Sequence, residues 1–157
     1  MADIRIVINK IQVAASLDLT SKIGRSIFDS LPMTVRFERW GDEICFPLDQ
    51  GKVDLRSPVT SVQLGDIAYS DQWKSFCIFY GKTPLSTEHD IVPNGPVEVI
   101  GRLREVQSAQ VLKRFFSSYL TRITRRICLL FSPSSGYGDT ITLEKIETPT
   151  RTVRSAA

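Results

Sequence analysis

The sequence predicts a mainly β protein, folded as a closed or nearly closed barrel with one helix in its N-terminal half. Many short segments alternate apolar and polar residues, as strands with one buried face do. Gly, Pro and Asn separate these segments at frequent intervals, and only one segment before residue 105 has helical spacing. With 157 residues, 42% of them hydrophobic, the chain is long enough for one well-buried core. We therefore expect a single domain over residues 1–147 and a flexible tail over 148–157.

The first predicted elements are a β-hairpin and a helix. Residues 3–8 alternate, Asn9-Lys10 supplies a two-residue turn, and residues 11–17 return as the partner strand. Thr20 or Ser21 offers an N-cap for the helix, and Pro32 ends it because proline lacks the N–H that a helix needs. The apolar residues that recur at helical spacing are Ile23, Ile27, Phe28 and Leu31.

The next part of the chain is rich in strand signals. Residues 35–40 alternate apolar and charged side chains, and residues 43–46 form a second short segment. Residues 62–69 contain a Gly-Asp turn, and residues 97–104 resume the alternation. Residues 73–80 are the most apolar of these segments, so we expect them to form a central, buried strand.

Residues 108–126 instead predict a basic amphipathic helix. Its apolar side is formed by Leu112, Phe116, Tyr119, Leu120, Ile123 and Ile127, and its opposite side includes Lys113, Arg114, Arg122 and Arg125. No acidic residue lies between Val106 and Gly138. The barrel is completed either by a strand at residues 138–144 or by one at residues 127–131, and the sequence leaves both alternatives open.

Two segments carry a family resemblance: Trp40-Gly41-Asp42-Glu43-Ile44 and Phe79-Tyr80-Gly81-Lys82-Thr83-Pro84. Together with the order and spacing of the other elements over roughly residues 3–105, they resemble a family of small, mostly prokaryotic proteins with a cyclophilin-like β-barrel and no settled activity. The resemblance implies a cyclophilin-like barrel. If residues 138–144 form the closing strand, the resemblance also implies that residues 106–137 are an insertion, since the typical member closes with a short loop and one strand.

The sequence contains no motif that indicates an enzyme, a metal site or a cofactor. The FHRV-type and FMIQGGD segments of true cyclophilins do not occur, so no catalytic role carries over to Arg36 or Arg39. His89 is the only histidine and is expected in a solvated loop. The odd number and wide spacing of Cys45, Cys77 and Cys128 predict reduced, structural thiols.

Our leading hypothesis is a binding module that recognises a small ligand or a short peptide, including a proline-containing one, in an aromatic cleft. Its candidate residues are Trp40, Phe46, Trp73 and Tyr80 as walls and Lys82 as an anchor for an anion. Taken singly, each of these rings is more often a core residue than a pocket wall.

Two alternatives remain open. One is a divergent peptidyl-prolyl isomerase. The other is an interaction protein whose basic helix docks on an acidic partner or an anionic membrane surface through Lys113, Arg114, Arg122 and Arg125. Nucleic-acid binding is disfavoured because residues 1–105 are slightly acidic. Since the sequence has no signal peptide and no long apolar segment, we expect a cytoplasmic protein.

Overall fold

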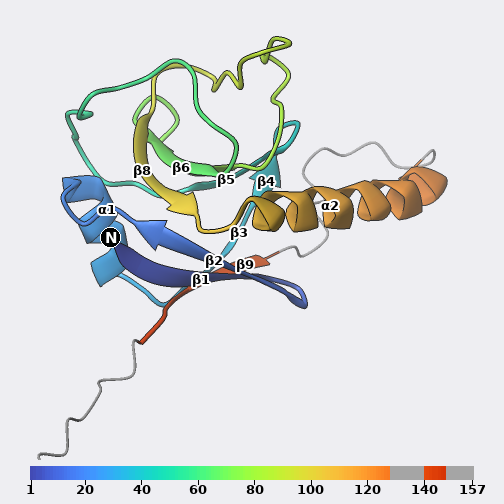
Figure 1. The fold of residues 1–157 in the computed structure, drawn as a ribbon, viewed down its shortest axis with the longest axis horizontal. Helices are drawn as coiled ribbons and strands as arrows, with labels where there is room; N and C mark the ends of the chain where they lie inside the picture. The colour runs from blue at the N-terminus through green and yellow to red at the C-terminus, as the bar shows by residue number, and fades with distance from the viewer. Residues whose placement is uncertain (128–139, 148–157) are drawn as a thin grey trace, which may run out of the picture.

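The structure is a computed structural model that describes residues 1–127 and 140–147, with side chains given for all of these except 118–127. Nine antiparallel strands and two helices make up this part of the chain, which confirms a mainly β fold (Figure 1). The strands are β1 (Ala2–Ile8), β2 (Ile11–Leu17), β3 (Met33–Arg36), β4 (Glu38–Arg39), β5 (Glu43–Pro47), β6 (Asp66–Ser70), β7 (Ser75–Phe79), β8 (Glu98–Leu103) and β9 (Thr140–Lys145). The helices are α1 (Lys22–Asp29) and α2 (Val106–Ile127).

The sheet closes on itself through a bend in one stretch of chain. The strand order is β3-β9-β1-β2-β8-β6-β7-β5-β4, so β3 and β4 lie at its two ends. Only Phe37 separates these two strands in the sequence. The stretch 33–39 therefore pairs with β9 in its first half and with β5 in its second half, which joins the two edges and confirms the predicted barrel.

The N-terminal elements form as the sequence predicts. β1 and β2 pair from Ala2↔Leu17 to Ile8↔Ile11, with Asn9 in the left-handed conformation at the turn (φ 53°). The Ser21 hydroxyl caps α1 by accepting a hydrogen bond from the Gly24 backbone N–H at 3.1 Å. The helix ends at Asp29, before a cis peptide bond at Leu31-Pro32.

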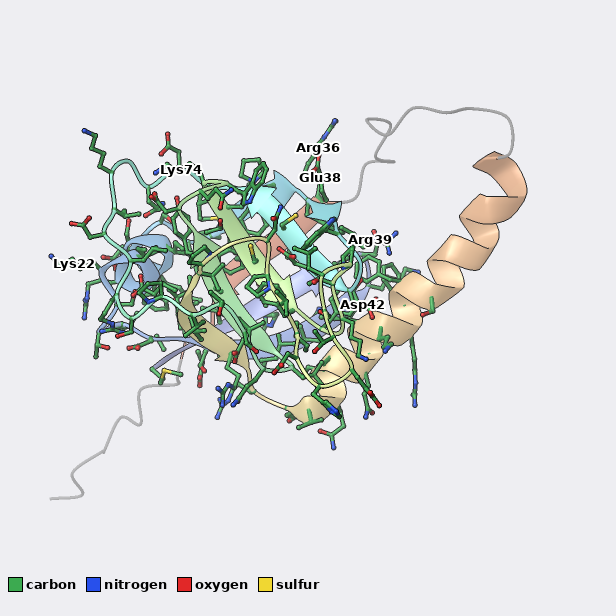
Figure 2. All side chains as sticks on the ribbon, turned by 90° about the horizontal axis from the view of Figure 1, so that it is seen from above. Lys22, Arg36, Glu38, Arg39, Asp42 and Lys74 are labelled. Atoms are coloured by element: carbon green, nitrogen blue, oxygen red, sulfur yellow. The ribbon has the colours of Figure 1, made fainter. Side chains whose placement is uncertain are left out.

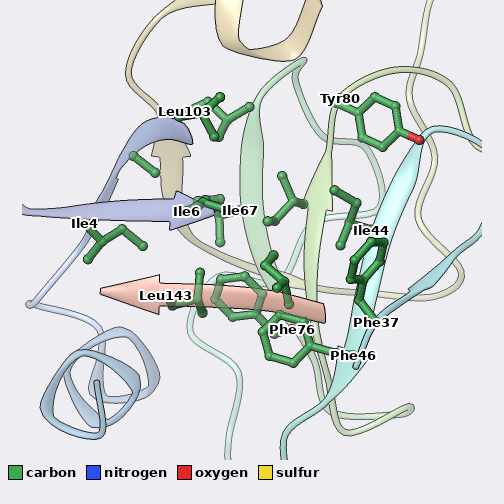
Figure 3. Close-up of a cluster of buried hydrophobic side chains, with 14 of the residues drawn as sticks. Ile4, Ile6, Phe37, Ile44, Phe46, Ile67, Phe76, Tyr80, Leu103 and Leu143 are labelled. Carbon is green, nitrogen blue, oxygen red and sulfur yellow. The ribbon is translucent and has the colours of Figure 1, made fainter. Parts of the chain in front are cut away.

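Side chains on the inner face of the strands fill the barrel, and a smaller cluster lies on its outer face. Figure 3 shows the inner cluster, in which Ile44, Phe46 and Phe76 face the interior. The outer cluster consists of Val62, Ala68, Cys77, Phe79 and Val97. Both faces of β7 are therefore buried, which explains why residues 75–79 are nearly all apolar and confirms a central strand there. Trp73 and Lys74, which were expected in this strand, lie instead in the turn before it, and Trp73 is 56% exposed.

The C-terminal part supplies the last strand. β9 pairs with β1 and with β3, so the strand expected at residues 138–144 is the one that completes the barrel. The alternative at 127–131 begins on the last residue of α2, and residues 128–131 lie outside the described residues, as does the tail predicted at 148–157. The start of α2 packs on the barrel through Ala109, Leu112 and Phe116, and the helix then extends beyond the strands (Figure 1). Within the described residues, no helix is long and apolar enough to cross a membrane.

Candidate binding site

The two segments that carry the family resemblance pack against each other. Trp40 and Glu43 exchange backbone hydrogen bonds (N···O 3.0 and 3.2 Å) around a turn with Gly41 at φ 60°. The Asp42 N–H donates to the Lys82 carbonyl at 2.9 Å, and the Tyr80 N–H donates to the Asp42 carbonyl at 3.0 Å. A Cβ on Gly41 would lie 2.7 Å from that Lys82 oxygen, so only glycine fits. This contact fixes the positions of Trp40 and Glu43.

A cavity of about 260 Å³ lies against the outer face of the barrel wall formed by β4, β5 and β7. The loop that precedes β8 covers it from the other side. Its lining combines two tryptophans, two thiols and polar groups: Glu38, Arg39, Trp40, Glu43, Cys45, Ser70, Trp73, Ser75, Cys77, Pro93, Asn94 and Val97. This mixture of rings and a few polar atoms is typical of small-ligand sites.

The structure brings only some of the predicted site residues together. Trp40 and Trp73 line the cavity, but Phe46 and Tyr80 are each 1% exposed and belong to the core. Phe46 stacks on Phe76 with ring centroids 4.8 Å apart, and Tyr80 packs on Phe116 at 5.4 Å. Lys82 is exposed and lies outside the cavity lining. Phe46 is not a wall of this cavity because neighbouring residues of β5 point to opposite faces: Glu43, Cys45 and Pro47 face outward, and Phe46 faces the core.

Glu43 is a site residue that sequence reasoning missed. Its side chain is buried (6% exposed), and within the described residues Oε2 has no hydrogen-bond partner. Burial raises the pKa of this carboxyl, and a hydrogen bond with Cys77 opposes the rise only in part. The signal in the sequence was the position of this carboxylate. Glu43 stands two residues before Cys45 in an otherwise apolar strand, so the two side chains share one face of that strand.

Cys45 and Cys77 lie beside Glu43 in the same wall. They are direct partners in the β5–β7 register, and both are free thiols, as predicted for these two cysteines. Burial, followed by the nearby carboxylates of Glu43 and Glu38, raises the pKa of Cys45 to about 12. Burial and Glu43 also raise the pKa of Cys77 well above its usual range. Cys128 lies outside the described residues.

Trp73 sits at the mouth of the cavity, on the β6–β7 hairpin. The ring is 56% exposed, and its indole Nε1–H donates to the Asn94 carbonyl at 2.9 Å. The backbone N–H of Trp73 donates to the Ser70 hydroxyl at 3.2 Å. The first bond ties the hairpin to the loop before β8, and the second lies within the hairpin, so Trp73 presents a fixed ring at the entrance.

The side of the cavity nearest α2 carries charged groups. The Arg39 guanidinium lies 4.5 Å from the centre of the Phe116 ring, and Lys113 Nζ lies 3.7 Å from an Asp42 carboxylate oxygen. Figure 2 shows Arg39 and Asp42 between the barrel and the first turns of α2. Lys113 and Arg114 are exposed, while the side chains of Arg122 and Arg125 are outside the described set. No group of three or more His, Cys, Asp or Glu side chains in the described part could hold a metal ion.

A family model described as Cyclophilin-like matches residues 2–124. The chain belongs to this family. The match covers the whole barrel except β9 and includes most of α2. Members of the Cyclophilin-like family share the fold, and the match assigns no ligand or activity to the cavity.

Two solved structures are similar to this Cyclophilin-like chain. A hypothetical protein from Archaeoglobus fulgidus is 26% identical, with a TM-score of 0.61, over 92% of this chain and 95% of that one. McbB, solved in complex with tryptophan, is 10% identical, with a TM-score of 0.64, over 92% of this chain and 45% of that one. The second likeness shows the fold alone. No curated protein matches the chain.

Proposed function

We propose that this Cyclophilin-like protein is a binding module that takes a small ligand, or one residue of a short peptide, in the outer cavity. The apolar part of the ligand would pack on Trp40 and Trp73, and a hydrogen-bond donor of the ligand would reach Glu43. The observation that carries the proposal is the unpartnered Oε2 of Glu43, buried in the wall of a cavity that both tryptophans line.

A buried acceptor without a partner is costly, by about 1–3 kcal/mol. An N–H or O–H group of a ligand would remove that cost when it donates to Oε2, because the buried oxygen then has a partner. The tryptophan rings add apolar contact and exclude water from the bond. The cavity, at about 260 Å³, favours a single ring or one side chain over an extended peptide.

Intrinsic fluorescence provides a direct test, because the chain contains two tryptophans and both line the cavity. Ring-sized probes that carry an amine or amide N–H would be titrated alongside isosteres that lack the donor. A short Ala-Pro peptide would be titrated in the same way. We expect the donor-bearing probes to shift the emission, and amide NMR of labelled protein to place the largest changes on β5 and β7.

Three variants make the test specific. Glu43→Leu replaces the acceptor with an apolar side chain of similar size. It should lower the affinity for donor-bearing probes by about tenfold or more. Trp73→Ala should abolish the emission shift that Trp73 reports. Leu85→Ala, an exposed apolar residue outside the cavity lining, is the control and should bind like the parent protein. Equal affinity of Glu43→Leu for probes with and without the donor is the expected result, whereas a preference for the donor-bearing probe as strong as that of the parent protein would overturn the role of Glu43.

The same peptide experiment separates the binding module from the isomerase alternative. Faster cis/trans exchange of the Ala-Pro bond in the presence of the protein would indicate a divergent peptidyl-prolyl isomerase. Amide shifts without faster exchange would support a binding module. If no probe changes either the emission or the amide spectrum, the cavity is not a binding site and the proposal fails.

A further inference from the structure

The paired thiols in the cavity wall have a specific backbone relationship. Cys45 of β5 lies directly opposite Cys77 of β7. In the same register, the Leu48 N–H donates to the Lys74 carbonyl at 2.7 Å, and the Tyr80 N–H donates to the Asp42 carbonyl at 3.0 Å. Because hydrogen-bonded and non-hydrogen-bonded pairs alternate along an antiparallel ladder, Cys45 and Cys77 form a non-hydrogen-bonded pair.

That kind of pair brings the two residues close enough for a covalent bridge. Directly opposite Cα atoms in a non-hydrogen-bonded pair are about 4.5 Å apart, and disulfides span Cα separations of about 4.4–6.8 Å. Both side chains project from the same face of the sheet. The next strand offers only Ala68 opposite Cys77, so a bulky neighbour does not separate the thiols.

A small reagent can also reach the pair. Both cysteines line the cavity, although Cys77 is only 4% exposed and Cys45 is half-buried. Trp73 lines the same cavity, and its ring is hydrogen-bonded to the Asn94 carbonyl on the opposite loop. The cavity therefore gives the thiols a route to solvent that an ordinary core cysteine lacks.

We propose that Cys45 and Cys77 form a reversible cross-strand disulfide, with a small-molecule disulfide as the oxidant. The sulfur of one cysteine, once deprotonated, attacks the small disulfide, forms a mixed disulfide and releases one small thiolate. The sulfur of the second cysteine attacks the mixed disulfide, forms the Cys45–Cys77 bond and releases a second thiolate. The two protons lost by the cysteines end on the two released small thiols. The protein has then lost two electrons, which the small disulfide has gained.

Oxidation would change the cavity that we propose as the ligand site. Cys77 lies beside the Glu43 carboxyl in the cavity lining and donates its S–H to the Ser75 carbonyl at 3.8 Å, whereas a disulfide has no S–H to donate. Oxidation would remove both S–H groups from the neighbourhood of Glu43, and the bridge would hold both sulfurs against the sheet. This consequence depends on the proposed function, whereas formation of the disulfide does not.

Equilibration in glutathione buffers tests the disulfide in the full chain with Cys128→Ser, which leaves the pair as the remaining thiols. After acid quench, the denatured protein is alkylated and its intact mass is measured. We expect oxidising buffers to remove both alkylation sites together, without added glutathione mass, and dithiothreitol to restore them. Cys45→Ser and Cys77→Ser should each form only a mixed disulfide with glutathione.

A displaced pair is the matched control. Cys77→Ser with Ser75→Cys keeps two thiols on the same strands and the same face of the sheet. It moves one thiol to the diagonal position opposite Pro47, about 7–8 Å from Cys45. This pair should remain reduced or glutathionylated in buffers that oxidise Cys45 and Cys77. Equal oxidation of both pairs, persistence of two free thiols in the parent pair, or disulfide-linked dimers would overturn the proposal.

The effect on the ligand site is measured separately. The donor-bearing probe would be titrated by fluorescence into the oxidised and the reduced protein, and we expect the oxidised form to bind several-fold more weakly. If the reduced protein binds no probe, the proposed function fails while the mass measurement still decides the disulfide. Equal affinity of both forms would overturn the link between oxidation and the cavity.

Discussion

Asp42 occupies the space in which Gly81 would carry a side chain. A Cβ on Gly81 would lie 2.6 Å from the Cβ of Asp42 and 2.8 Å from its Cγ. On the other side of the same contact, a Cβ on Gly41 would press on the Lys82 carbonyl. Each turn therefore requires a glycine in the other, and together they hold Trp40 and Glu43 at the cavity.

Gly81→Ala should destabilise the protein by about 1–3 kcal/mol, because a methyl group at this position overlaps Asp42. The free energy of unfolding would be measured by chemical denaturation. Asp42→Gly removes the overlapping side chain, so it should recover most of the loss when combined with Gly81→Ala. If the changes in the free energy of unfolding of the two single variants simply add up in the double variant, overlap with Asp42 is not the cause of the destabilisation by Gly81→Ala.

Glu43 should make stability depend on pH. Its pKa is raised in the folded protein, so the folded state keeps a proton that the unfolded chain has already released. The free energy of unfolding therefore falls as pH rises from the ordinary glutamate pKa through the raised one, and is constant above it. Glu43→Gln should remove this fall and should be more stable than the parent protein at neutral pH.

Denaturation at a series of pH values between about 4 and about 8 would check this prediction. Glu38→Gln removes a carboxyl from the exposed rim of the same cavity, so it separates the effect of burial from that of a general change in charge. A stability difference between Glu43→Gln and the parent protein that stays the same at every pH would contradict the argument.

Local patterns in the sequence were enough to predict the barrel, the first hairpin, the cap of α1 and one of the two alternatives for the last strand. The cavity was harder to predict because it depends on which face each residue of β5 takes. That face is set by pairing with β7, about thirty residues away, and β7 shows no alternation since both of its faces are buried. Phe46 was therefore expected at the cavity, and Glu43 was passed over.

Tyr80 combines a buried ring with a buried hydroxyl, and substitutions can separate the contributions of these two groups to stability. Its ring is fully buried against Phe116, and within the described residues its hydroxyl has no hydrogen-bond partner of normal geometry. Burial raises the pKa of this hydroxyl to about 12, although the neighbouring Arg39 opposes the rise. Tyr80→Phe should leave stability unchanged or slightly increased, because it removes only a poorly partnered polar group.

Tyr80→Ala should instead cost about 3–5 kcal/mol, as expected when a large ring is removed from a packed core. Both variants would be compared by chemical denaturation, with Trp73→Ala as the partly exposed aromatic control. If Tyr80→Phe lowers the free energy of unfolding as much as Tyr80→Ala does, the hydroxyl, and not the ring, stabilises the fold.

The basic helix α2 remains a hypothesis for partner binding, and an anionic membrane surface is its most easily tested partner. The backbone of α2 continues past Phe116 and beyond the strands (Figure 1), and the sequence places Arg122 and Arg125 opposite its apolar side. Each basic residue near an anionic surface contributes about 1 kcal/mol. Arg122→Glu with Arg125→Glu should therefore reduce co-sedimentation with vesicles that contain phosphatidylserine by about tenfold or more at low salt.

Lys10→Glu, on the turn between β1 and β2, is the control and should sediment like the parent protein. Neutral phosphatidylcholine vesicles should retain much less of the parent protein, and added salt should release it because exposed charges are screened. If the parent protein stays in the supernatant with anionic vesicles at low salt, the membrane hypothesis is excluded. Low salt is decisive here because attraction between the helix and an anionic surface is strongest under that condition. An acidic protein would then be the remaining partner class for α2.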